Sequence, residues 1–159
     1  MITHQRLIEL LDYDPESGIF RWRVARGCKP AQSVAGYRER RGYIMIKIDG
    51  AIPQYAHRLA FLYVTGRWPI EVDHRDLDRS NNRWSNLREA QTHSANLANQ
   101  QGKGPYSKGV RKTSAGRFAS RLTNMGKTLY LGTFDNPEEA HAAYVAKANE
   151  IYGEFARAE

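Results

Sequence analysis

The chain has 159 residues, enough for one ordinary domain or two small ones. Hydrophobic residues make up 41% of it and charged residues 26%, a composition that excludes a disordered chain. No apolar run approaches the roughly 20 residues that a membrane-spanning helix needs, and the N-terminus has no apolar signal core, so we expect a cytoplasmic protein without a membrane partner. The single cysteine, Cys28, excludes an internal disulfide and a cysteine-based zinc site. Any metal ion must then be held by oxygen and imidazole ligands.

The positive charge is concentrated in one stretch. The formal net charge is +7, which by itself only suggests a polyanionic partner. Residues 103–127 contain seven basic residues and no acidic one, whereas residues 128–159 contain two basic and six acidic ones. A basic segment next to an acidic one indicates that a single face of the protein binds a polyanion.

Hydrophobic periodicity predicts short elements along the first hundred residues. A helix is expected over residues 3–12 with Thr3 as its cap, then a turn and a strand over residues 20–24. A basic loop follows over residues 25–42, then a strand over residues 43–48, a hairpin turn at Asp49-Gly50 and a short strand near Ile52. Residues 56–65 form a mostly apolar helix that Gly66 ends. A strand ending in an Asp-His pair, a polar loop and a second strand over residues 87–90 come next.

The sequence predicts a second module behind a flexible linker at residues 101–105. Three short strands are expected over residues 108–112, 117–122 and 128–131. A helix follows, with Asn136 as its cap, Pro137 at its first position and Glu139 completing a capping box, and it ends at Gly153. We therefore divide the chain into a domain of residues 1–101, with its motif in residues 70–100, and a domain of residues 102–159.

Residues 70–96 carry the side chains that phosphodiester hydrolysis needs. Their Asp and Asn residues offer hard oxygen ligands for magnesium or manganese. The histidine of the Asp-His pair can take a proton from water near neutral pH, and neighbouring arginines can hold phosphates. Since Asn-rich loops are also common turns, the residue types alone leave a metal site and a plain turn both open.

The same stretch resembles the HNH homing and phage endonucleases. The match covers about residues 37–100 and includes the lead-in His57-Arg58-Leu59-Ala60. The motif positions are Asp73-His74, Asn81-Asn82, Asn86-Leu87-Arg88 and Asn96.

The resemblance implies a ββα-metal fold and a role for four residues. Asp73 would bind one divalent metal ion, Mg²⁺ or alternatively Mn²⁺, and His74 would be the general base. Asn86 would brace the loop that orients His74, and Asn96 would be the second metal ligand. The segment before Asn96 is one residue longer than in the family, so His93, about one helical turn earlier, is the alternative ligand. His57, on an apolar helix, is interpreted as structural, with a phosphate contact as the alternative.

Residues 106–153 resemble the plant ethylene-response-factor (Apetala-two) DNA-binding domain. The resemblance rests on the order and spacing of Gly116-Arg117-Phe118, Tyr130-Leu131-Gly132 and Ala143-Tyr144, among other matches. It implies a three-stranded antiparallel sheet that lies in the major groove and is backed by one helix. The expected DNA-binding residues are Arg111, Arg117, Arg121 and Lys127. The alternative is a solvated basic sheet face.

Together, these observations predict an α+β protein with two modules, a ββα-metal nuclease domain and a small three-stranded antiparallel sheet packed on one helix. The predicted function is a metal-dependent endonuclease of the phage or mobile-element homing type, which nicks or cuts double-stranded DNA in the bacterial cytoplasm. No obligate protein partner is expected. The alternative is a non-catalytic, sequence-specific DNA-binding regulator on the same folds.

Overall fold

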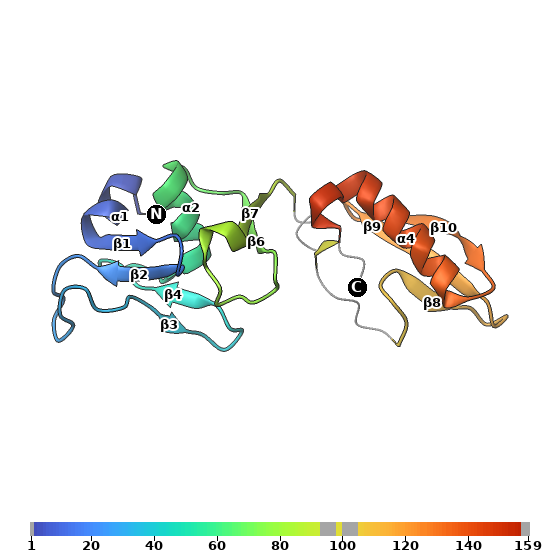
Figure 1. Cartoon of the computed structure of the whole chain (residues 1–159), viewed down its shortest axis with the longest axis horizontal. Coiled ribbons are helices and arrows are strands. Elements are labelled where there is room, and N and C mark those ends of the chain that lie inside the picture. The colour runs from blue at the N-terminus through green and yellow to red at the C-terminus, as the bar shows by residue number, and fades with distance from the viewer. Residues whose placement is uncertain (1, 93–97, 100–104, 157–159) are drawn as a thin grey trace. The chain divides into compact units, whose positions relative to one another are not determined.

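The computed structural model describes residues 2–92, 98–99 and 105–156. The chain forms two compact units, Met1–Ala90 and Gln91–Glu159 (Figure 1). The boundary predicted after residue 101 lies outside the described residues. Within the described ranges, no helix has the length and apolar character that crossing a membrane requires.

The first unit begins with a helix and a hairpin. Helix α1 (His4–Leu10) is capped as predicted, since the Thr3 hydroxyl accepts a hydrogen bond from the Arg6 amide. The prediction that this helix extends to residue 12 was wrong: β1 (Leu11–Asp14) pairs antiparallel with β2 (Ile19–Trp22). Leu11 and Tyr13 are buried whereas Asp12 and Asp14 are not, which is the period of two that a strand requires.

A small sheet and a helix follow. Strands β3 (Tyr37–Arg38), β4 (Ile44–Ile46) and β5 (Gln54–Tyr55) form an antiparallel sheet in that order. The predicted loop over residues 25–42 thus contains β3, and the strand expected near Ile52 begins at residue 54 instead. Helix α2 (Ala56–Thr65) is confirmed, and it ends at Gly66, whose φ of 75° is the left-handed conformation of a helix cap.

The predicted strand pair around the Asp-His dipeptide is confirmed as β6 (Glu71–His74) and β7 (Leu87–Ala90), which pair antiparallel. A 3₁₀ turn, η1 (Trp84–Asn86), leads into β7. The ring of Trp84 packs against that of Phe61 on α2 at 4.7 Å between centroids. The core of this unit draws on the hairpin, the small sheet and both helices, and its fully buried members include Leu7, Leu11, Ile46 and Leu59.

The second unit contains three antiparallel strands and a long helix. Strands β8 (Val110–Lys112), β9 (Phe118–Asn124) and β10 (Lys127–Phe134) lie in the order β10-β9-β8. Helix α4 (Pro137–Tyr152) packs on them and continues into η2 (Gly153–Phe155). Its predicted cap is confirmed, since the Asn136 side chain accepts a hydrogen bond from the Glu139 amide at 2.8 Å.

A glycine allows the helix to lie close to the sheet. A Cβ atom at Gly109, whose φ is +83°, would lie 2.1 Å from Cδ2 of Tyr144 on α4. That distance is far inside van der Waals contact, so only glycine fits at this position.

Candidate active site

The β6–β7 pair places Asp73 and His74 side by side in a buried position. Both come at the end of β6, where Asp73 lies opposite Arg88 and His74 opposite Leu87. Their exposed fractions are only 6% and 5%. Burial of two polar side chains on one short strand requires partners for each of them.

Asp73 is paired across the sheet with Arg88. The Nε and Nη2 atoms of Arg88 both donate to Oδ2 of Asp73, at 2.9 and 2.8 Å, and the arginine is itself only 7% exposed. The guanidinium therefore balances the charge of the buried carboxylate and fixes its orientation. Sequence reasoning included Arg88 in the motif but assigned it no role, although the cross-strand register predicts this pair.

His74 is oriented by Asn82. The Nε2 atom of His74 lies 3.2 Å from Oδ1 of Asn82, a side chain that is only 3% exposed. Because an amide oxygen can only accept a hydrogen bond, Nε2 carries the proton, and Nδ1 is the basic atom of the neutral ring. Burial lowers the pKa of His74 from its ordinary value, against the raising effects of the Asn82 hydrogen bond and of the charges on Asp76, Asp73 and Asp78. The ring is therefore neutral at neutral pH, as a general base must be.

Asn82 is held in turn by the N-terminal hairpin. The Tyr13 hydroxyl on β1 donates to the Asn82 carbonyl at 2.7 Å, and the Asn82 amide group donates to the Ser80 carbonyl at 3.2 Å. The Trp84 amide donates to the carbonyl of Pro15 at 2.9 Å. The β1–β2 turn thus supports the loop that positions His74, which the sequence did not predict.

Asn86 ties both ends of the same loop together. Its side-chain nitrogen donates to Oδ1 of Asp76 at 2.9 Å and to the Asn81 carbonyl at 2.8 Å. Its side-chain oxygen accepts from the Asp76 amide at 3.1 Å. These contacts restrain residues 76–81, which begin two positions after His74.

His57 of α2 lies against His74, a contact that the sequence interpretation missed. The two rings meet edge to face at 5.0 Å, and His57 also stacks on Tyr55 at 5.3 Å. Nδ1 of His57 is buried and has no hydrogen-bond partner among the described residues. Burial, followed by the charges of His74 and Arg58, lowers its pKa to about 3, so His57 stays neutral. The motif His57-Arg58-Leu59 was the available signal for this contact.

The remaining predicted site residues fall into two groups. Asn96 and the alternative ligand His93 lie outside the described residues. Within the described ranges, no group of three or more His, Cys, Asp or Glu side chains is arranged to hold a metal ion. The predicted DNA-binding residues Arg111, Arg117, Arg121 and Lys127 belong to the second unit, and all are exposed. Arg117 pairs with Asp135 at 2.9 Å, and Arg121 lies opposite Tyr130 in the sheet.

Comparison with known proteins agrees with this geometry. Residues 54–98 match a family model described as HNH endonuclease. An uncharacterized HNH endonuclease of Acanthamoeba polyphaga mimivirus is 36% identical over 105 residues, which are 63% of this chain and 54% of the viral protein. The chain thus spans about half the length of this relative. No solved structure matches the chain. The segment from β5 through the β6–β7 pair, which holds Asp73 and His74, is therefore similar to HNH endonucleases.

Proposed function

We propose that this chain is a divalent-metal-dependent DNA endonuclease in which His74 is the general base. The HNH domain supports a nuclease, which hydrolyses phosphodiester bonds. The observation that carries the assignment of His74 is its geometry: a buried, neutral imidazole beside a carboxylate, with Nε2 held by Asn82. A general base needs this combination of a defined tautomer and a pKa below the working pH.

The residues around His74 support its proton transfer in both protonation states. Nδ1 takes the proton from the attacking water, while the Asn82 hydrogen bond prevents the ring from rotating. Once protonated, the imidazolium is stabilised by the charges of Asp76, Asp73 and Asp78. Asn86 restrains the loop through Asp76 and Asn81, so the imidazole of His74 is already in position before the reaction begins.

The donor chemistry near His74 fits a hard cation such as Mg²⁺, with Mn²⁺ as the alternative. Magnesium is commonly held by one or two carboxylates together with water and substrate phosphate oxygens. Asp73 supplies one carboxylate, and Arg88 orients it through Oδ2. We assign Asn96 as the second protein ligand, with His93 as the alternative. When bound, the cation supplies positive charge to the scissile phosphate and to the departing 3′ oxygen.

We further propose that the second unit is an Apetala-two-like domain that binds double-stranded DNA through its sheet. Its support is the exposed basic residues of the strands, Arg111, Arg121 and Lys127, together with Arg117 just before β9. A second binding module raises the local concentration of DNA at a nuclease. The viral relative supports an origin in a phage or other mobile element, and action in the cytoplasm of a bacterial host is part of the proposal.

Cleavage of supercoiled plasmid tests the proposal. Wild-type protein with Mg²⁺ is expected to give nicked or linear DNA, and EDTA or His74→Ala is expected to abolish both products. Asn96→Ala and His93→Ala, assayed over a Mg²⁺ titration, identify the second ligand as the one whose loss raises the metal requirement. If the wild-type protein binds DNA but cuts none with either metal, the non-catalytic DNA-binding regulator is the better description.

A further inference from the structure

Four exposed arginines lie around the turn between β3 and β4. We call this group the arginine turn, and it consists of Arg38, Arg40, Arg41 and Arg79. Among the described residues, none of the four forms an ion pair with a carboxylate. In contrast, the exposed Arg6 and Arg23 both do. Binding a phosphate at the arginine turn therefore breaks no existing ion pair.

The turn itself is held rigid by its only carboxylate. Oε1 of Glu39 accepts hydrogen bonds from the amides of Arg41 and Tyr43, at 2.8 and 3.3 Å. The backbone of Glu39 also pairs with Tyr43 and Gly42, and Gly42 has a φ of +92° that glycine adopts without strain. Because Glu39 holds backbone amides, it does not fix the side chains of Arg40 and Arg41, which are exposed.

The turn is connected to the proposed active site through Arg79 and Tyr43. The Nη1 atom of Arg79 donates to the Arg41 carbonyl at 3.1 Å, and its guanidinium lies 4.9 Å above the ring of Tyr43. The ring of Tyr43 is in turn 6.2 Å from that of His74. Successive phosphates of one DNA strand advance by about 3.4 Å along the helix axis. In a duplex with its scissile phosphate at His74, a phosphate a few nucleotides away is therefore within the span that Tyr43 and Arg79 bridge.

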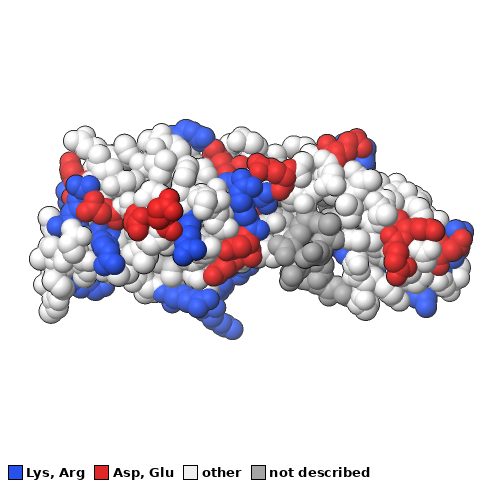
Figure 2. All heavy atoms as spheres, in the orientation of Figure 1, with Lys and Arg blue, Asp and Glu red and all other residues white. Residues whose placement is uncertain are grey.

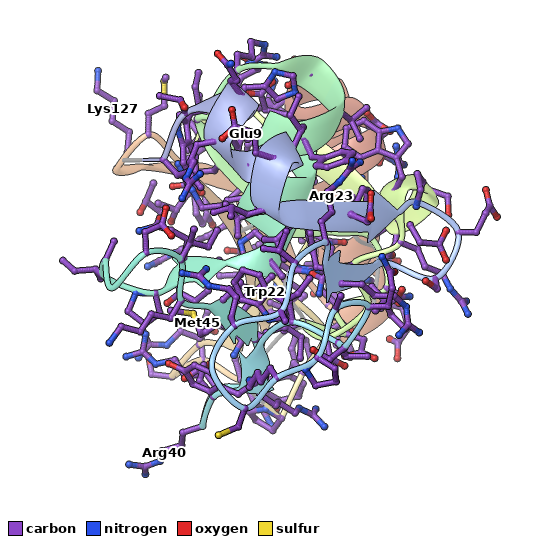
Figure 3. The ribbon with its side chains drawn as sticks, turned by 90° about the vertical axis from the view of Figure 1, so that its left-hand side faces the viewer. Glu9, Trp22, Arg23, Arg40, Met45 and Lys127 are labelled. Carbon is purple, nitrogen blue, oxygen red and sulfur yellow. The ribbon has the colours of Figure 1, made fainter. Side chains whose placement is uncertain are left out.

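The surface is open at this place. Glu39, Arg40, Arg41 and Tyr55 line a pocket beside the turn, and Tyr55 is the ring that stacks on His57. Figure 2 shows Lys and Arg side chains projecting from the surface over the β3–β4 turn. In Figure 3, Arg40 points away from the body of the unit, whereas Arg23 lies beside α1 and β1. A DNA backbone can thus reach the arginines without any rearrangement of the fold.

We propose that the arginine turn binds backbone phosphates of duplex DNA on one side of the scissile phosphate. The nuclease unit then binds DNA independently of its sequence, in addition to any DNA binding by the second unit. Guanidinium groups suit this task because each presents several N–H donors to phosphate oxygens. The link to cleavage rests on the proposed nuclease function, whereas the phosphate binding does not.

The test is the salt dependence of DNA binding by the full chain. The affinity for several unrelated duplexes is measured by fluorescence anisotropy in EDTA, so that no cleavage occurs. The double variant Arg40→Ala/Arg41→Ala is compared with Arg6→Ala/Arg23→Ala, which removes the same charge from arginines that are already paired. Each lost phosphate contact lowers the slope of log affinity against log salt by about one, so we expect a decrease of about two for the first variant alone.

The decrease should be the same for every duplex, and Arg40→Lys/Arg41→Lys should restore most of the slope because it keeps the charge. Equal slopes for the wild-type protein and the Arg40→Ala/Arg41→Ala variant would overturn the proposal, as would an equal decrease in the Arg6→Ala/Arg23→Ala control. Plasmid cleavage is measured in parallel. If the slope decreases in the Arg40→Ala/Arg41→Ala variant but the wild-type protein never cuts DNA, the nuclease assignment is refuted and the phosphate binding by the arginine turn is retained.

Discussion

Replacing His57 with phenylalanine should remove a large part of the acid sensitivity of the first unit. His57 is 6% exposed and lies among aromatic rings, so the folded chain keeps it neutral down to its pKa of about 3. In the unfolded chain the same side chain titrates near 6.5. Below pH 6.5 His57 therefore binds a proton in the unfolded state but not in the folded state. The free energy of unfolding decreases as the pH falls from 6.5 towards 3.

The size of this effect follows from the two pKa values. Each pH unit between them costs about 1.4 kcal/mol, so from pH 7.5 to pH 5 the wild-type unit should lose about 2 kcal/mol through His57 alone. Above pH 6.5 the histidine contributes no pH dependence. His57→Phe keeps an aromatic ring at this position and has no titrating group, so its stability should lack this loss.

Urea unfolding at pH 7.5, 6 and 5, followed by tryptophan fluorescence, measures the difference. All three tryptophans, Trp22, Trp68 and Trp84, lie in the first unit, so the signal reports on that unit only. The free energy of unfolding should fall more steeply in the wild-type protein, by about 2 kcal/mol over this range. Parallel pH profiles of the two proteins would refute the argument, because they would mean that His57 is protonated in the folded state as readily as in the unfolded one.

Three further changes test other parts of the structure. Asn82→Ala removes the partner that orients His74, the proposed general base, and should lower kcat about 10- to 100-fold, with the affinity for DNA in EDTA unchanged. Arg88→Ala removes the ion pair of the buried Asp73 carboxylate and should cost about 3–5 kcal/mol in urea unfolding. Gly109→Ala forces a methyl group into the ring of Tyr144 and should destabilise the second unit by about 1–3 kcal/mol. Thermal unfolding monitored by circular dichroism measures this loss. Gly126→Ala, also at positive φ but with open space around it, is the control for backbone strain and should cost less.

The elements with local signals were predictable from the sequence. Helix α4 could be predicted from its N-cap, and helix α2 from its apolar face and the glycine that ends it. Both signals are local, because the residues that begin and end a helix lie next to it in the chain. The β6–β7 pair follows from the motif, which fixes Asp73 and His74 at the end of one strand. The first helix was predicted too long because Leu10 and Leu11 also fit a helical apolar face. The pairing of β1 with β2 makes Leu11 part of a strand, and helical periodicity carries no information about strand pairing.

The contacts that define the site were not predictable in the same way. Asn82 was recognised as part of a motif, but its bond to His74 depends on how the loop folds back over eight residues. His57 is 17 positions before His74, and only the packing of α2 against β6 brings the two rings together. Such partners are set by tertiary packing, so residue type and spacing identify the candidates and leave their pairing open.

The bond between Tyr13 and Asn82 means that the smallest autonomous unit around His74 is larger than the segment that matches the HNH family model. The matching residues 54–98 contain Asp73 and His74, but the loop that carries Asn82, the partner of His74, is hydrogen-bonded to a hairpin from the start of the chain. A fragment limited to residues 54–98 would lose the contacts of the hairpin together with most of the hydrophobic core. Substitutions in the β1–β2 hairpin therefore act on the loop that orients His74, and transplanting this segment onto another scaffold requires a substitute for the hairpin.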